Sequence, residues 1–83
     1  MKQYNLKQIA KIDGIELSEI HNQFLTNKKL WRTYNGTYQP YTYKTIWMYT
    51  RDYVPAKVLL VLMDILKLKF DKNGRIVIGS DNV

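Results

Sequence analysis

The middle of the chain alternates basic and aromatic side chains, and this pattern is the clearest chemical signal in the sequence. No Asp or Glu occurs between Glu19 and Asp52. Thirteen residues of these two kinds fall inside that window: Lys28, Lys29, Arg32, Lys44 and Arg51, with Phe24, Trp31, Tyr34, Tyr38, Tyr41, Tyr43, Trp47 and Tyr49. Cations neutralise phosphates, and tyrosine hydroxyls donate hydrogen bonds to phosphate oxygens. The window therefore favours binding to a nucleic acid.

Residues suited to catalysis or metal binding are scarce. His21 is the only histidine, and the chain has no cysteine. Zinc sites use clusters of these residue types, and covalent catalysis needs a nucleophile beside a base. The carboxylates are scattered and the four glycines are isolated, so neither a carboxylate pair nor a phosphate-binding loop is indicated. We expect no enzyme activity, no metal and no cofactor.

The length and the net charge further limit the class of protein. The 83 residues suit one domain spanning 1–83, and the formal net charge of +6 favours an acidic partner. The N-terminus shows no apolar signal-peptide stretch, and the longest apolar run, 58–63, is too short to cross a bilayer. We expect a soluble cytoplasmic protein with no membrane partner. The absence of cysteine is compatible with a reducing compartment.

Two short amphipathic helices are predicted at the start of the chain. In the first, over 6–12, Leu6, Ile9 and Ala10 share one face; Asn5 can cap it, and Asp13-Gly14 should end it. The second should run from 16 or 17 to 26, with Leu17, Ile20 and Phe24 on its apolar face and Asn27 near its end.

The rest of the chain mixes hairpins and helices. Asn35-Gly36 predicts a β-hairpin at about 30–43, which Pro40 should limit. A helix over 42–51 should begin at Thr42 and turn Ile46, Trp47 and Tyr49 inward. The apolar helix 55–66 is either ordinary core or the seam of a homodimer. A second hairpin is predicted over 66–79, with 80–83 frayed. We expect Trp31 and Trp47 to be mostly buried and some tyrosines to be exposed.

Ala10, Gly14 and Ile20 stand at the spacing of a helix-turn-helix motif, which places a small residue, a tight turn and a branched apolar residue at these positions. The segment 6–26 resembles this motif in phage Cro-type repressors and in the MerR and excisionase families. A wing after the motif, here 30–43, and a Tyr such as Tyr4 before it favour the MerR and excisionase type. The resemblance implies an α+β fold: a small winged helix-turn-helix domain, mainly helical, with one or two β-hairpins.

The resemblance also implies which residues touch DNA. The second helix would enter the major groove, the basic residues after it would grip phosphates, and the wing tip would reach a minor groove. With Tyr34 and the other basic positions of the window, the predicted DNA-binding set is Ser18, Glu19, His21, Asn22, Gln23, Lys28, Lys29, Arg32, Tyr34, Asn35, Lys44 and Arg51. One departure matters. The second helix has no cation before Lys28 and carries Glu16 and Glu19, so either the wing leads the docking or the motif serves only as a scaffold.

Three functions follow from these patterns. The first is a sequence-specific double-stranded DNA-binding regulator or repressor, or an excisionase-like factor, of a phage or other mobile element. The second is a protein-interaction module or inhibitor that binds a host protein through its Tyr-rich basic face, since Tyr, Trp and Arg dominate protein-binding hot spots. The third is a single-strand or RNA binder with exposed aromatic rings. A homodimer is compatible with the first, because paired DNA half-sites match a paired protein.

Overall fold

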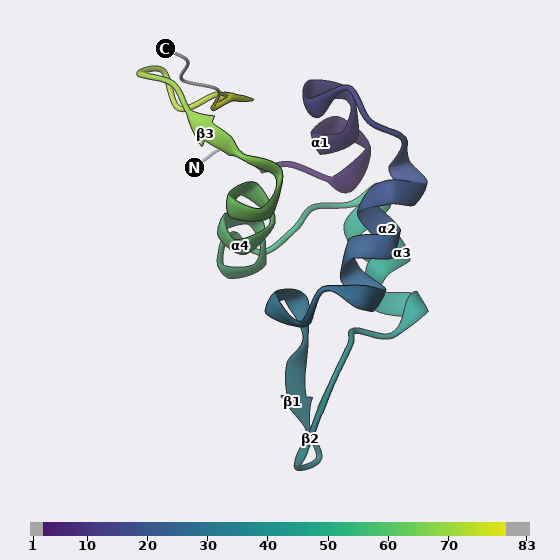
Figure 1. Ribbon diagram of the computed structural model, residues 1–83. Helices are drawn as coiled ribbons and strands as arrows, with labels where there is room; N and C mark the ends of the chain where they lie inside the picture. Colours follow the sequence, from purple (N-terminus) through teal and green to yellow (C-terminus); the bar gives the residue numbers. More distant parts are fainter. Residues whose placement is uncertain (1–2, 80–83) are drawn as a thin grey trace.

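In the part of the chain that the structure describes, the fold consists of four α-helices and two antiparallel hairpins (Figure 1). The computed structural model describes residues 3–79. Its elements are α1 (Leu6–Asp13), α2 (Leu17–Thr26), the 3₁₀ turn η1 (Lys28–Leu30), β1 (Arg32–Tyr34), β2 (Thr37–Gln39), α3 (Tyr43–Arg51), α4 (Ala56–Leu66), β3 (Leu68–Phe70) and β4 (Ile76–Ile78). The mixed α+β class is thus confirmed, while the assignment to winged helix-turn-helix domains stays a prediction.

The helix pair α1–α2 is fixed by caps and a tight turn. Asn5 Oδ1 accepts a hydrogen bond from the Gln8 backbone N–H at 2.9 Å, and Gln8 Oε1 accepts one from the Asn5 N–H at 2.8 Å. This reciprocal pair satisfies two donors that a helix start leaves open. At the other end Gly14 adopts φ 74°, and the N–H groups of Gly14 and Ile15 both bond to the Ala10 carbonyl, at 2.9 and 3.1 Å. The predicted helix ends are confirmed.

The β1–β2 hairpin projects from the helices at the bottom of Figure 1. Asn35 and Gly36 both have positive φ, 52° and 78°, which is the backbone of the tight turn that Asn-Gly favours. The strands pair Arg32 with Gln39 and Tyr34 with Thr37, and the ladder stops before Pro40. The predicted hairpin is confirmed, and we refer to β1–β2 as the wing.

The core lies between the helix pair, α3 and α4. Its largest fully buried side chains are Phe24, Leu6, Ile9, Ile20, Ile46, Leu62 and Thr50. Tyr4 ties the start of the chain to this core: its carbonyl accepts from the Val54 N–H at 2.7 Å, and its hydroxyl accepts from the Ile76 N–H at 3.1 Å. The segment before α1 is therefore held against both the α3–α4 connection and the second hairpin.

The C-terminal hairpin β3–β4 is also as predicted. Leu68 pairs with Ile78 and Phe70 with Ile76. The Asp71 carboxylate accepts the N–H groups of Asn73 and Arg75, at 2.8 and 2.9 Å, which shapes the turn. The prediction that 80–83 are frayed falls outside the described residues. Within residues 3–79, no helix combines the length and apolar character of a bilayer span.

The two tryptophans do not follow the prediction. Trp47 is 49% exposed, so its expected burial is wrong, and Trp31 is only half-buried. Helix α3 instead turns Ile46, Tyr49 and Thr50 inward. These three positions share one face of a helix, and Trp47 lies on another. The expected surface tyrosines are confirmed: Tyr34, Tyr38, Tyr43 and Tyr53 are exposed.

Candidate nucleic-acid interface

His21 faces the interior rather than the outer side of α2. Its Nε2 lies 2.9 Å from the Thr50 Oγ1, and its ring meets the Trp47 ring edge-on at 5.1 Å between centroids. The Thr50 hydroxyl proton is donated to the Ile46 carbonyl at 2.8 Å, so His21 must be the donor, from Nε2. Burial lowers the pKa of His21, which favours the neutral form of the ring. This predicted DNA contact therefore joins α2 to α3.

The outer side of α2 carries Ser18, Glu19 and Asn22, all exposed, and the half-buried Gln23. These four residues form one wall of a shallow hollow of about 540 Å³, completed by Asp13, Ile15 and Leu66. No Lys or Arg lines it. Burial raises the pKa of Asp13, and the nearby Glu19 carboxylate raises it further. The start of α2 is thus an acidic surface, which repels phosphates.

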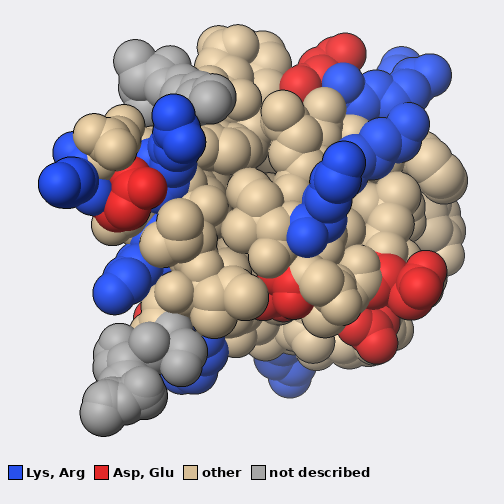
Figure 2. All heavy atoms as spheres, turned by 90° about the horizontal axis from the view of Figure 1, so that it is seen from above, with Lys and Arg blue, Asp and Glu red and all other residues tan. Residues whose placement is uncertain are grey.

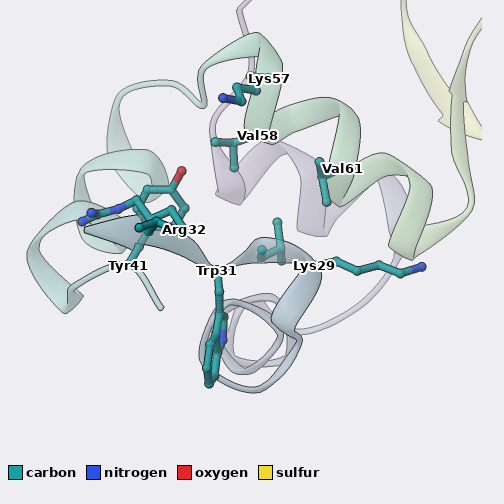
Figure 3. A pocket seen from close by; sticks show the side chains of 9 residues that line it. Lys29, Trp31, Arg32, Tyr41, Lys57, Val58 and Val61 are labelled. Carbon is teal, nitrogen blue, oxygen red and sulfur yellow. The ribbon is translucent and has the colours of Figure 1, made fainter. Parts of the chain in front are cut away.

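A second hollow lies between the base of the wing and α4, and its charge is opposite (Figure 3). It measures about 450 Å³ and is lined by Lys29, Leu30, Trp31, Arg32, Thr33, Tyr41, Lys57, Val58 and Val61. Three of these residues are cations, and none is an acid. Figure 3 shows β1 facing Val58 and Val61 of α4 across the opening, with the Trp31 ring turned away from α4. We call this site the basic hollow.

Arg32 is held in place by two tyrosine rings. Its guanidinium carbon lies 4.7 Å from the ring centroids of both Tyr34 and Tyr41. Tyr41 is fixed in turn, because its ring packs at 6.2 Å from Phe24 and at 5.7 Å from Tyr49. Across residues 3–79, Arg32 has no ion pair, so its N–H donors stay available to an anion. A guanidinium on a ring can bind a phosphate at its edge while its face remains on the ring.

The wing is anchored to the turn that precedes it. The Tyr38 hydroxyl donates to the Lys28 carbonyl, and the Tyr38 ring packs 5.7 Å from that of Trp31. Lys28 Nζ lies 5.7 Å from the Trp31 ring centroid. These contacts bring Lys28, Lys29, Arg32, Tyr34 and Asn35 of the predicted set into one region, with the exposed Asn35-Gly36 turn at its tip.

The last two predicted contacts lie elsewhere. Lys44 and Arg51 are exposed on α3, on the same side as Trp47 and Met48, and neither lines either hollow. Tyr41 and Lys57 are lining residues of the basic hollow that the sequence did not indicate as contacts. The sequence shows that Lys57 is a cation near the start of an apolar helix. Its nearness to Arg32 arises only from the packing of α4 against η1.

Charge elsewhere on the surface is mixed. Figure 2 looks down on α1 and the C-terminal hairpin, and both blue and red side chains are visible on that face. Among residues 3–79, no group of three or more His, Cys, Asp or Glu side chains could hold a metal ion. The chain matches no protein-family model, no curated protein and no solved structure.

Proposed function

We propose that this protein binds double-stranded DNA and that the wing and the basic hollow lead the docking. The observation that carries the proposal is the basic hollow itself, whose lining residues include Lys29, Arg32 and Lys57 and no acidic residue. Three cations around one concave surface suit the phosphates of a backbone that runs past the wing. Arg32 supports this reading most strongly, because its guanidinium is already held by Tyr34 and Tyr41.

The acidic start of α2 favours this mode over insertion of that helix into the major groove. Asp13 and Glu19 would face phosphates there, and like charges at that position cost affinity. Lys28, Lys29, Arg32 and Lys57 would instead contact the backbone, and the Asn35-Gly36 tip would enter a groove. A role in regulation, or as an excisionase-like factor of a mobile element, is the corresponding biological proposal and depends on the resemblance of the α1–α2 motif.

The proposal is tested by fluorescence anisotropy with a random labelled duplex over a salt series. Four phosphate contacts predict that log K falls with log salt at a slope of about −3.6. Unlabelled single-stranded DNA should compete less well than unlabelled duplex. Lys72→Ala removes one exposed cation from the β3–β4 turn and is the matched control for Arg32→Ala. The absence of binding at low salt, or equal losses in both variants, would contradict the proposal.

A second candidate function is favoured by the exposed side of α3. Tyr43 is 67% exposed, Trp47 49% and Met48 47%, and the basic residues Lys44 and Arg51 accompany them. Exposed aromatic and basic side chains on one helix are typical of a protein-binding hot spot, here for an acidic partner. Tyr43→Ala with Trp47→Ala should leave duplex binding unchanged under the first proposal. If the chain binds no duplex and this double variant abolishes binding to a host protein, the second candidate holds.

A further inference from the structure

Helix α4 presents one outward stripe that none of residues 3–79 covers. Lys57 and Asp64 are exposed, Leu60 is 54% exposed, and Val61 is half-buried. Successive residues turn by about 100° around a helix, so these four positions share roughly 100° of its surface. The opposite side faces the core through Val58, Leu59, Leu62 and Met63. The stripe is therefore an apolar pair between one positive and one negative end.

This stripe is complementary to itself when reversed. Its midpoint falls between Leu60 and Val61, and Lys57 and Asp64 stand equally far from it along the chain. If a second copy of α4 lies antiparallel across it, Lys57 meets Asp64 of the second copy, and Leu60 meets Val61 of the second copy. A two-fold axis repeats each contact, as an isologous interface requires. We propose that α4 forms the contact of a symmetric homodimer.

The surface beside the stripe offers a partly apolar hollow to the second copy. A shallow hollow of about 460 Å³ is lined by Lys29, Leu60, Val61 and Asp64. Leu60 of the second copy can pack into it, which buries both leucines. The two Lys57–Asp64 pairs then flank the apolar contacts and select the antiparallel direction, because a parallel pairing would place like charges together. This inference does not depend on DNA binding.

The contact is small, so the dimer is expected to be weak. A helix of 11 residues is only about 16 Å long, and one helix pair buries less than the roughly 1,200 Å² of a standard stable interface. We therefore expect half-dimerisation at about 0.1–1 mM chain. The mass measured by sedimentation equilibrium without DNA should rise from 9.9 kDa towards twice that value over this range.

Charge exchange across the axis tests the pairing. Asp64→Lys alone and Lys57→Asp alone should each weaken dimerisation at least tenfold, because each places like charges opposite one another. The double variant Lys57→Asp/Asp64→Lys should return it to within about threefold of the original, since both pairs are restored in reverse. The fold should survive, because Asp near a helix start and Lys near its end are favourable. Circular dichroism checks this.

Net charge cannot mimic this result. Lys57→Asp removes one positive charge and adds one negative, so the formal net charge falls from +6 to +4. Weaker general repulsion would then strengthen association, whereas the proposal requires that it weaken. Lys44→Asp on α3 changes the net charge equally and is the control, with no effect expected. A chain that stays monomeric at 1 mM, or that dimerises with no response to the single exchanges, overturns the proposal. Duplex binding is measured separately on the unsubstituted chain, at concentrations far below the dimerisation range, because Lys57 also lines the basic hollow.

Discussion

Removal of the Thr50 hydroxyl tests how α2 is held against α3. Thr50 is fully buried, and its Oγ1 accepts from His21 at 2.9 Å and donates to the Ile46 carbonyl at 2.8 Å. Thr50→Val keeps the branched shape but leaves the His21 N–H without this acceptor. A lost hydrogen bond of this kind destabilises a fold by about 1–2 kcal/mol. The bond to Ile46 contributes little, because that carbonyl already accepts within the helix.

The free energy of unfolding is measured by urea denaturation, with thermal unfolding as a second readout. For a domain of this size each kcal/mol shifts the Tm by roughly 4–8 °C. Thr26→Val is the matched control, because the Thr26 Oγ1 makes only a bond to the Asn22 carbonyl at 2.8 Å on the exposed surface. We expect this control to change stability by less than about 0.5 kcal/mol.

A double-mutant cycle with His21→Ala isolates the contact between the two side chains. If the hydrogen bond joins α2 to α3 as described, the two changes should be coupled by about 0.5–1.5 kcal/mol. Additive effects, or a Thr50→Val loss as small as that of Thr26→Val, would refute the reasoning. His21 would then be an ordinary surface residue, and its exclusion from the candidate interface would need revision.

Three further predictions concern pH, the α1–α2 turn and α3. Burial lowers the pKa of His21, so the folded chain binds fewer protons than the unfolded chain. The free energy of unfolding should therefore fall as the pH drops from about 6.5. Urea midpoints at pH 7.5, 6.5 and 5.5 should show this loss, and His21→Ala should remove the pH dependence. Gly14→Ala should destabilise the fold by about 1 kcal/mol or more, because φ is 74° at this position, although an added Cβ would meet no atom within 4 Å. Gly14→Asn should destabilise it less in the same assay. An unchanged stability of Gly14→Ala would contradict the left-handed backbone at Gly14. Trp47→Phe should remove the red-shifted, acrylamide-quenched part of the fluorescence, and Trp31→Phe should leave most of it, since Trp47 is the more exposed; the reverse result would contradict the orientation of α3.

The helix ends and the hairpin turns could be predicted from residue types that act over a few positions. The side chains of Asn5 and Thr42 each accept the N–H of the third residue of the helix that follows, α1 and α3. Gly14 and the Asn35-Gly36 turn adopt the positive φ that their residue types tolerate. Each of these signals acts over two to four residues. The helix ends and both hairpins were therefore predictable without any tertiary information.

The orientation of α3 could not be read in the same way. Its sequence carries large apolar or aromatic side chains on more than one face, so hydrophobic periodicity does not choose between Trp47 and Thr50 for the interior. In the fold, His21, 29 residues away, supplies a partner for the Thr50 hydroxyl. A buried polar side chain selected by a distant partner leaves no local signal.

The candidate site was likewise only partly predictable from the sequence. The clustering of Lys28, Lys29 and Arg32 was visible because these residues are close in sequence. Lys57 and Tyr41 were missed because α4 packing and an aromatic cluster bring them to the basic hollow. The acidic surroundings of Ser18 and Asn22 were visible in the sequence, because Asp13 and Glu19 lie close to them along the chain. The closing of that hollow by Leu66 of α4 follows from tertiary packing.

The most direct test of the account is to locate the DNA contact by NMR, with ¹⁵N-labelled protein titrated with a short duplex. The account predicts that the amide shifts concentrate in 28–36 and around Lys57, with small changes at Ser18 and Asn22 and almost none on α3. Shifts centred on Tyr43–Arg51, or on the outer side of α2 with an undisturbed wing, would contradict it.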